Sequence, residues 1–331
     1  MTRLLPWALR FVVFAFVLLS MLSFATSLHW TGEVLSNFRV QFLIASLVLW
    51  LVSVMAREIV ATLVLLVCIG THLYPIGPYL NLAPPAAIAA PWTDKTRILT
   101  LNLDGDDSDV GKVRKLVYTE SPDVIVFTEL YGPAHRTFFN ELRKDWPYRL
   151  GPVFENPHEV LVMSRIPYVN AQVTRSRRSG NMVRIVRFCP DKDTAHDDCF
   201  TLIAAHPIRT QAHEPHQLWR NATLGVVAKA ASKEDGRVIV AGDLNVTPWS
   251  PAFAALTEKG QLSDTGLGRG LTATWMTDNP LFGLWIDHIL VGKCITVDQH
   301  RLGPAVGSDH YPVIADVHVA DECRDGSPDH S

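Results

Sequence analysis

Three long apolar runs in the first 80 residues constrain this chain more than any other feature of its sequence. They are Phe11–Thr26, Val40–Ala56 and Ile59–Leu80. Each is close to the roughly 17–25 residues that a helix needs to cross the hydrocarbon core of a bilayer. Three such runs in succession are difficult to bury in a soluble domain. The sequence therefore predicts a membrane anchor over residues 1–80, with transmembrane helices at about 11–27, 40–56 and 59–80.

The flanking charges predict which way the anchor faces. Arg3 and Arg10 precede the first run, and Ser-Phe-Ala lies near its end, a pattern that also suits a cleaved signal peptide. The second and third runs predict an anchor in either case, with a tight turn at Arg57-Glu58. With Arg3 and Arg10 on the cytoplasmic side, three crossings place residues 81–331 outside the cytoplasm. We therefore expect a multi-pass protein of the cell membrane with an extracytoplasmic domain.

The composition changes after the third run. Residues 1–93 hold four Arg, two Glu and no Lys, whereas the whole chain holds 30 Lys and Arg against 33 Asp and Glu. The remainder is therefore a mildly acidic globular segment, which is not suited to indiscriminate binding of nucleic acid. Hydrophobic residues make up 48% of the chain, which excludes a disordered protein. We expect a short linker over 81–93, a globular domain over 94–320 and a tail over 321–331.

The cysteines indicate the redox environment of that domain. Cys68 lies in the third apolar run, and the other four follow it in the globular part: Cys189, Cys199, Cys294 and Cys323. An even number is compatible with two disulfides in an oxidising compartment, although four unpaired thiols remain an alternative. Cys189 and Cys199 would close a short polar loop between two predicted strands, so we favour that pair.

Short Val- and Ile-rich runs predict the strands of the globular domain. They are 96–103, 123–128, 159–164, 182–188, 200–205, 237–241, 285–291 and 313–319. Helical patterns follow Asp107-Ser108-Asp109 and Ser250, which are plausible N-caps, and also cover 133–144 and 214–232. Because several predicted strands are adjacent in sequence, we expect an α/β (α+β) domain with two packed sheets flanked by helices, not a regular parallel series.

Polar residues stand at the ends of these strands, where rigid scaffolds present functional groups. The six segments are Leu-Asn-Leu-Asp-Gly (101–105), Phe-Thr-Glu-Leu (127–130), Ala-Ala-His-Pro (204–207), Ala-Gly-Asp-Leu-Asn (241–245), Trp-Ile-Asp-His (285–288) and Gly-Ser-Asp-His-Tyr-Pro (307–312). An isolated Asp at a strand end is usually a turn or cap residue. Six such segments in this order form a far more specific pattern.

This pattern resembles the endonuclease/exonuclease/phosphatase superfamily of metal-dependent phosphoesterases. The likeness runs from about Thr96 to Val319, and its strongest parts are Gly242-Asp243-Leu244-Asn245 and Ser308-Asp309-His310. The resemblance implies a four-layer α/β sandwich with two central mixed sheets and an active site at one edge. It also implies hydrolysis of a phosphate ester. Similar bacterial members anchored by three helices act on cell-envelope substrates, including lipid pyrophosphates.

The residue types suit a hard cation. A phosphate ester repels an anionic nucleophile, so its hydrolysis needs a cation, an activated water and donors for the phosphoryl oxygens. Mg²⁺, with Mn²⁺ as a possible substitute, prefers oxygen ligands. Glu129 follows the run Val124–Phe127 and is the best single candidate ligand. Asp104 shares one side of an extended strand with Asn102. The resemblance adds Asn102 and Asp309 to this metal set.

Five residues are the catalytic candidates: His206, Asp243, Asn245, Asp287 and His310. Asp243 is suited to hold or deprotonate the attacking water, and Asn245 to donate its amide to a phosphoryl oxygen. The resemblance pairs Asp287 with His310, as general base or charge stabiliser, since a carboxylate fixes the tautomer of an imidazole. It also places His206 where it protonates the leaving oxygen or binds phosphate. Whether Asp243 or His310 takes the water proton stays open.

A cluster of arginines gives the substrate candidates. Arg178 and Arg184 belong to a basic stretch over 175–187, which would meet a phosphate-rich substrate or anionic lipid head groups, although a solvated surface is the simpler explanation. The main hypothesis is a membrane-anchored, Mg²⁺-dependent phosphoesterase that favours lipid-linked or envelope phosphate. The alternatives are an extracytoplasmic nuclease and, less favoured, an inactive envelope binding module. We expect the bilayer and the substrate as partners and see no sign of an obligate protein partner.

Overall fold

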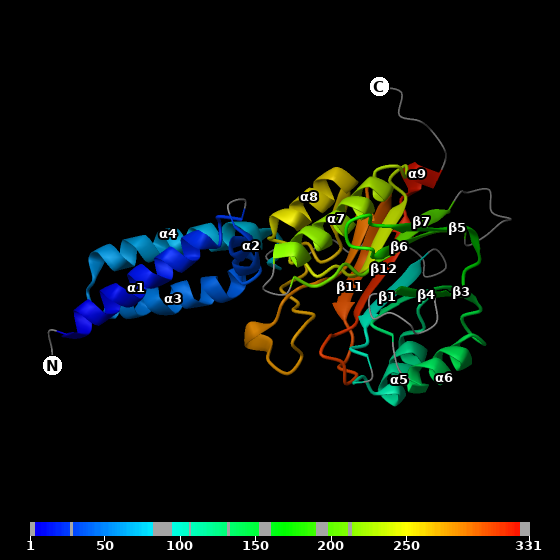
Figure 1. The fold of residues 1–331 in the computed structure, drawn as a ribbon, viewed down its shortest axis with the longest axis horizontal. Helices are drawn as coiled ribbons and strands as arrows, with labels where there is room; N and C mark the ends of the chain where they lie inside the picture. Colours follow the sequence, from blue (N-terminus) through cyan, green and yellow to red (C-terminus); the bar gives the residue numbers. More distant parts are fainter. Residues whose placement is uncertain are drawn as a thin grey trace, which may run out of the picture.

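The computed structural model describes residues 4–26, 29–81, 95–105, 107–130, 133–151, 160–189, 198–210 and 214–324. Nearly all of the predicted linker over 81–93, and the tail beyond Arg324, lie outside these ranges. The described chain has two parts, a group of N-terminal helices and an α/β sandwich, which meet side by side (Figure 1).

Two six-stranded sheets form the centre of the sandwich. The first has the order β11 (Ile295–Leu302), β12 (Val313–Val319), β1 (Thr96–Asn102), β2 (Val124–Thr128), β4 (Val160–Ser164) and β3 (Tyr148–Leu150). The second has the order β5 (Tyr168–Arg175), β6 (Met182–Phe188), β7 (Phe200–Ala205), β8 (Val238–Asp243), β10 (Asp287–Gly292) and β9 (Leu262–Asp264). In each sheet one central pair is parallel, β1 with β2 and β7 with β8, and the other neighbours are antiparallel. The predicted mixed sheets are confirmed.

Helices cover the two outer faces, which gives the predicted four layers (Figure 1). The helices α5 (Val110–Glu120) and α6 (Pro133–Leu142) pack on the first sheet, and α7 (Glu214–Ala231) and α8 (Pro251–Gly260) on the second. A third apolar cluster, from Ile98 to Val319, lies between the sheets. Strands buried on both faces explain why their sequences are continuous runs of Val and Ile, not alternating patterns.

Two predicted N-caps begin these helices. The carboxylate of Asp109 accepts hydrogen bonds from the backbone N–H groups of Gly111 and Lys112 at the start of α5. The hydroxyl of Ser250 accepts one from Ala252 at the start of α8, where Pro251 occupies the first helical position. Each cap satisfies donors that the first turn of a helix leaves unpaired.

The cysteines form two disulfides, Cys189–Cys199 and Cys294–Cys323, and Cys68 is free and buried. The first bond is the pair that the sequence favoured. The second ties α9 (Asp321–Arg324) to the turn between β10 and β11. Both therefore restrain the sandwich at chain segments that lie outside its central strands.

The N-terminal helices only partly match the predicted anchor. They are α1 (Leu4–Leu22), α2 (Trp30–Ser36), α3 (Arg39–Met55) and α4 (Ile59–Ile76), which runs into a short 3-10 helix, η1 (Gly77–Tyr79). In the described chain, one helix is long and apolar enough to cross a membrane, Ile59–Tyr79, with a mean hydropathy of 2.1. A second crossing requires α2 and α3, which meet at 72°, to act as one span. The helix of the first run, counted over Pro6–Leu22, is shorter than a span by the same measure.

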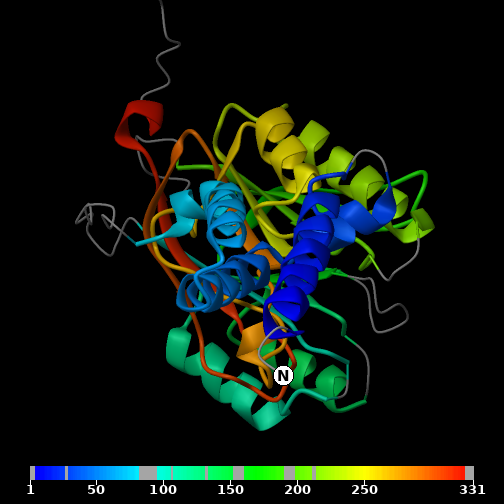
Figure 2. The same ribbon diagram turned by 90° about the vertical axis from the view of Figure 1, so that its left-hand side faces the viewer.

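The prediction of three spanning helices was therefore wrong: length and composition support one, or two if the bent pair is one span. The physical reason is length: α3 covers the second run with 17 residues, and the helix of the first run is also too short. Only α2 could lengthen α3 into a span, but the two helices meet at 72°, and Glu33 of α2 pairs with Arg220 of α7. Seen from the side of these helices, α1, α3 and α4 stand in front of the sandwich (Figure 2).

Candidate active site

The predicted site segments meet at one edge of the two sheets. Residues after the carboxyl ends of β1, β2, β7 and β8 come to the same edge as residues before β10 and β12, because the latter strands run antiparallel to their neighbours. A cleft of about 310 Å³ opens there. It is lined by Asn37, Asp104, Glu129, Arg209, Thr210, Asp243, Asn245, Trp275, Leu284, Ile286, Asp309 and His310.

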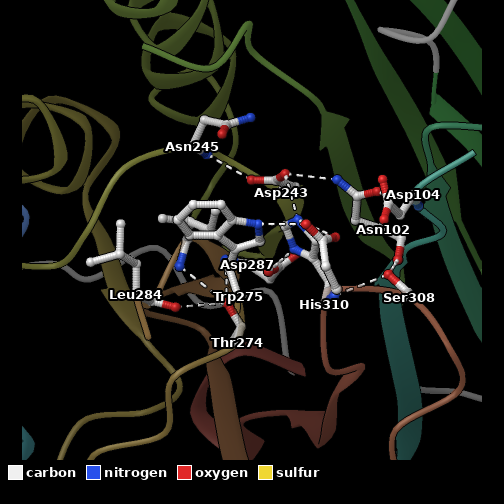
Figure 3. A network of polar contacts seen from close by, with 12 residues as sticks. Asn102, Asp104, Asp243, Asn245, Thr274, Trp275, Leu284, Asp287, Ser308 and His310 are labelled. Carbon is white, nitrogen blue, oxygen red and sulfur yellow. Dashed lines mark hydrogen bonds and ion pairs between the residues drawn. The ribbon is translucent and has the colours of Figure 1, made fainter. Parts of the chain in front are cut away.

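Asp243 is the centre of the polar network (Figure 3). Its Oδ2 accepts a hydrogen bond from Nδ2 of Asn102 at 2.9 Å, and its Oδ1 accepts one from the backbone N–H of Asn245 at 2.9 Å. The same Oδ2 lies 3.6 Å from Nε2 of His206 and 3.9 Å from Nε2 of His310. Burial alone would raise the pKa of Asp243, but the two imidazoles and Asn102 hold it below its ordinary value. Asp243 is therefore a carboxylate at neutral pH.

Gly242 permits this arrangement. A Cβ on Gly242 would lie 2.1 Å from the carbonyl oxygen of Ala205, and its φ is +144°, where side chains are rarely found. Only glycine lets the end of β8 approach the end of β7 so closely. That approach brings Asp243 beside His206, which follows Ala205.

His310 is held by Asp287. Its Nδ1 donates to Oδ2 of Asp287 at 2.7 Å, and its Nε2 faces the cleft, 3.5 Å from Oδ1 of Asp309. Burial alone would lower the pKa of His310, but the charge and hydrogen bond of Asp287, with the charges of Asp243 and Asp309, raise it to about 10. Asp287 is directly opposite Asp243 in the β8–β10 register, which explains how residues distant in sequence converge. The predicted pairing is present in the structure.

His206 lies between two carboxylates. Its Nε2 is 3.5 Å from Oε1 of Glu129 and 3.6 Å from Oδ2 of Asp243, and the residue is 1% exposed. Burial disfavours its charged form, but Asp243 and Glu129 outweigh that effect, so its pKa is raised. Asn181 fixes the local backbone by donating to the carbonyl oxygen of His206 at 3.2 Å.

Three site residues have a left-handed backbone. Of the seven non-glycine residues with positive φ in the described chain, Asp104 (50°), Glu129 (54°) and Asn245 (52°) all line the cleft. Such conformations are uncommon outside glycine and gather at functional sites, where surrounding contacts enforce them. They also alter one expectation: β1 ends at Asn102, so Asp104 lies in a turn and not on an extended strand.

The predicted metal residues Asn102 and Asp104 differ in their surroundings. Asp104 lines the cleft, and burial together with the charges of Asp309 and Glu129 raises its pKa. Asn102 is buried, and its Oδ1 accepts a hydrogen bond from the N–H of Asp104 at 2.9 Å. Asn102 therefore connects the turn after β1 to Asp243, and its role as a metal ligand stays a prediction.

Asn245 has a similar supporting contact. Its side chain lines the cleft, while its Nδ2 donates to the carbonyl oxygen of Pro207 at 3.0 Å. This bond joins the segment after β8 to the segment after β7. The second proton of the amide leaves Asn245 able to donate to a phosphoryl oxygen.

The sequence left three residues in or beside the cleft without a firm role. Trp275 donates from Nε1 to Oδ2 of Asp309 at 2.8 Å and pairs in a β-bridge with His310. Ser308 donates to the carbonyl oxygen of Asn102 at 2.7 Å and accepts from the N–H of His310. Arg209 supplies a cation at the cleft. Ser308 and Arg209 could have been found from their positions beside the motifs that contain His310 and His206, whereas Trp275 carried no such signal.

The two predicted substrate arginines lie elsewhere. Arg184 is buried in β6 and donates from Nε to the carbonyl oxygen of Val160 at 2.5 Å. Arg178 lines a separate groove of about 880 Å³ between the β5–β6 hairpin and α7. Neither is among the described residues that line the cleft, so their contact with substrate stays a prediction.

The donor set fits a divalent cation. Ligand atoms of Glu129, His206 and Asp243 lie within 4.8 Å of one another, and so do those of Asp243, Asp287 and His310. The described lining of the cleft carries four carboxylates, and burial together with the charges of Asp309 and Glu129 raises the pKa of Asp104. Hard oxygen donors with excess negative charge are typical of sites for such cations. Glu129, with Asp104 beside it, is the predicted ligand that this geometry favours most.

This chain matches a known protein family in sequence, and it is similar in fold to several solved structures. Residues 99–310 match the Endonuclease/Exonuclease/phosphatase family. A protein of that description from Beutenbergia cavernae DSM 12333 superposes with a TM-score of 0.55 at 18% identity, covering 69% of this chain and 72% of that one. D. rerio TDP2 complexed with a single-strand DNA product gives 0.55 at 17% identity, covering 68% and 99%. The human Nocturnin catalytic domain with bound sulfate gives 0.53 at 15%, covering 69% and 95%.

A comparison with curated proteins by sequence found no match. At these identities the solved structures establish the fold alone, and the matched pattern establishes the family. The pattern begins within β1 and ends at His310, so it spans every predicted metal and catalytic residue. The chain belongs to the endonuclease/exonuclease/phosphatase family, whose members are divalent-metal-dependent hydrolases of phosphoric ester bonds.

Proposed function

We propose that this protein is a membrane-anchored, Mg²⁺-dependent phosphoesterase that hydrolyses a lipid-linked or other cell-envelope phosphate ester. The observation that carries the proposal is the convergence of six strand-end segments on one cleft. Asp243 stands at its centre, with both imidazoles within 4 Å of Oδ2, at 3.6 Å and 3.9 Å. A structural role alone would not require so many buried ionisable groups at one sheet edge.

The charges of the site suggest separate roles for Asp243 and His310. Asp243 is anionic and accepts hydrogen bonds on both oxygens, so it is suited to orient water and to take its proton. His310 is protonated and points Nε2 into the cleft, so it is suited to stabilise negative charge on the phosphoryl group. We therefore assign the water proton to Asp243, which the sequence left undecided.

The remaining residues complete an in-line displacement. Water forms a new bond to phosphorus, its proton passes to Asp243, and the bond from phosphorus to the ester oxygen breaks. His206, whose raised pKa favours the imidazolium form, donates a proton to the departing oxygen. Asn245 and Arg209, which line the cleft, hold the phosphoryl oxygens. Glu129, Asp104 and Asp309 would hold Mg²⁺, which neutralises the charge of the phosphate group when bound.

The N-terminal helices support membrane anchoring by their inverted polarity. In α1, α3 and α4 the exposed side chains are large and apolar, such as Phe11, Met55 and Val60. The buried side chains of these helices include Ser20, Ser46, Ser53 and His72, and Ser20 shares a hydrogen bond with His72. A helical bundle in water shows the opposite arrangement, whereas helices in lipid pack small and polar residues against each other.

The disulfides support an extracytoplasmic sandwich, because such bonds persist in oxidising compartments. A reporter fusion at residue 93 tests the orientation. A reporter that works only outside the cytoplasm should be active, and one that works only in the cytoplasm should be inactive. Cytoplasmic activity would overturn the localisation.

The lining and position of the cleft support a lipid-linked substrate. Apolar Leu284 and Ile286 lie in its lining together with the phosphate-suited polar groups, and Asn37 of the N-terminal helices contributes to the same lining. The cleft therefore opens where the sandwich meets the proposed anchor. A phosphate on a membrane lipid would reach it without leaving the surface.

A nuclease is the second candidate, and a specific observation favours it. The groove that contains Arg178 also has Arg175, Arg177, Lys229 and Lys233 in its lining, and the solved TDP2 relative is complexed with single-strand DNA product. A nuclease that used this groove would lose affinity steeply with added salt. An inactive binding module is less favoured, because a dead copy should have lost some of the catalytic residues.

A substrate panel with the full chain decides among these. Single-stranded and duplex DNA, RNA, phospholipids, sphingomyelin and polyprenyl pyrophosphates are each offered with Mg²⁺ and with a chelator, and His310→Ala is the inactive control. We expect Mg²⁺-dependent release of phosphate or head group from a lipid substrate only. Cleavage of nucleic acid alone would favour the nuclease. Equal inertness of wild type and His310→Ala on all substrates would favour the binding module.

A further inference from the structure

The segment 244–249 follows Asp243 and contains Asn245, whose side chain bonds to Pro207 within the sandwich. Asn245 has a strained backbone, with a φ of 52°. Besides the contacts within the sandwich, three groups of contacts that begin in the N-terminal helices hold this segment. We propose that these helices are a working part of the active site, and that Glu33 and Asn37 are positioning residues for catalysis.

The first connection is a buried ion pair. Glu33 of α2 pairs with Arg220 of α7 and also accepts a hydrogen bond from Gln217. Arg220 is fully buried and donates from Nη1 to the carbonyl oxygen of Asn245 at 3.1 Å. Because a buried guanidinium needs a counter-charge, Glu33 sets where Arg220 lies. Arg220 in turn fixes the peptide of Asn245.

The second connection is direct. Asn37, in the turn between α2 and α3, accepts hydrogen bonds on Oδ1 from the N–H and the hydroxyl of Thr247, at 3.3 and 2.9 Å. Its carbonyl oxygen accepts a hydrogen bond from Nε1 of Trp249 at 2.9 Å. Asn37 also lines the cleft itself. The turn between α2 and α3 therefore forms a wall of the active site.

The third connection begins at η1. The hydroxyl of Tyr79 donates to Oδ2 of Asp264 at 3.4 Å, and the same oxygen lies 3.3 Å from Nδ1 of His288. Nε2 of His288 donates to the carbonyl oxygen of Val246 at 2.8 Å. His288 therefore belongs to the support of segment 244–249.

These contacts explain how a non-glycine residue keeps a strained conformation beside the catalytic carboxylate. Strain persists only where surrounding contacts over-determine the backbone. Release of the carbonyl of Asn245 would let the backbone rotate at this residue, which would move its N–H away from Oδ1 of Asp243, a hydrogen bond of 2.9 Å. Small displacements of that kind cost catalysis far more than substrate binding.

The test uses the full chain in detergent and rests on the proposed phosphoesterase activity, with bis(4-nitrophenyl) phosphate as probe. Glu33→Gln is compared with Glu58→Gln, the same chemical change at an ion pair with Arg10 on the turn between α3 and α4, at the far end of the helices (Figure 1). We expect Glu33→Gln to lower kcat about 10-fold to 100-fold with KM nearly unchanged. Glu58→Gln should match wild type.

A double-mutant cycle separates positioning from general stability. If Glu33 acts through Arg220, then Glu33→Gln combined with Arg220→Met should be no slower than Arg220→Met alone. Additive losses would contradict the proposal. Asn37→Ala and its partner variant Thr247→Val provide the same comparison at the second connection, in case the charge variants fail to fold.

Hydrogen exchange gives a readout that does not depend on substrate. Backbone amides of 244–249 should lose protection in Glu33→Gln but not in Glu58→Gln, at temperatures where both are folded. Equal protection and equal kcat in the two variants would overturn the inference while leaving the proposed function intact. An inert wild type would instead defeat the proposed function, and the exchange result would still decide whether the helices position this segment.

Discussion

Asp287 sets the charge of His310, and this gives a prediction about pH. The folded pKa of His310 is raised to about 10 from 6.5, so the stability that its proton provides is complete below pH 6.5 and is lost as pH rises through 10. If the imidazolium is required, activity should fall over the same alkaline range. Asp287→Asn removes the negative charge that raises the pKa of His310, while burial still lowers that pKa. The alkaline limb of the pH–rate profile should therefore shift to lower pH. We expect kcat to drop about 100-fold or more, measured as a pH–rate profile.

An unshifted alkaline limb in Asp287→Asn would contradict this assignment. His288→Gln is an unsuitable control, because His288 supports the segment after Asp243. A suitable control is Asp278→Asn, an exposed carboxylate that is not in the described lining of the cleft.

Glu129 gives the second prediction at this scale, which concerns the metal. Glu129→Gln keeps the size of the side chain and removes one negative charge from the proposed ligand set. We expect the Mg²⁺ concentration for half-maximal activity to rise about 10-fold or more, with direct binding measured by calorimetry. Glu258→Gln, the same change at an exposed position of α8, should leave metal affinity unaltered. Equal affinities would remove Glu129 from the metal site.

The disulfides carry the prediction at the scale of elements. Cys294–Cys323 closes a longer stretch of chain than Cys189–Cys199, with sequence separations of 29 and 10. Loop entropy predicts that removing the first costs about 3.6 kcal/mol of unfolding free energy and removing the second about 2.7 kcal/mol. Paired Cys→Ser variants in urea unfolding measure this. Activity should be retained, since the described lining of the cleft contains neither pair. The reverse ranking would mean that native-state contacts outweigh chain entropy.

The strands also show which secondary structure the sequence pattern predicts and which it misses. The eight predicted strands are all present, because each carries a short run of Val and Ile that is buried on both faces. The four strands that were not predicted, β3, β5, β9 and β11, are the edge strands of the two sheets. Most of the side chains of β5 are exposed, and β11 has mixed burial with an irregularity between Val297 and Gln299. Edge strands gain their structure from pairing with a neighbour, and a run of polar residues does not reveal that neighbour.

For the whole molecule, the helices predict behaviour in membranes. The full chain should sediment with membranes, resist extraction by high salt or alkaline carbonate, and dissolve in detergent. The physical reason is that α1, α3 and α4 expose many large apolar side chains in the described structure, and insertion into lipid would remove them from water. Fractionation followed by immunoblotting measures this. Release by salt alone would show that the helices do not insert.

The prediction of three membrane spans also shows that hydropathy alone does not determine how the apolar runs fold. Three apolar runs of similar length gave three expected spans, yet α3 has only 17 residues and makes a span only together with α2, which meets it at 72°. Hydropathy does not register that Glu33 meets a cation in the sandwich or that Asn37 receives the hydroxyl of Thr247. These contacts join residues that are 187 and 210 positions apart in the sequence.

The sequence by itself determined the fold class, the strand-end motifs and the family. These depend on local patterns of residues: continuous apolar runs, N-caps, and acidic or imidazole side chains after strands. Only the tertiary structure decided that β8 and β10 place Asp243 opposite Asp287, that Asn102 donates a hydrogen bond to the carboxylate of Asp243, and that Asn37 of the turn between α2 and α3 lines the cleft. The reason is physical: contact between distant segments depends on how sheets and helices pack in space, which no local pattern of residues specifies.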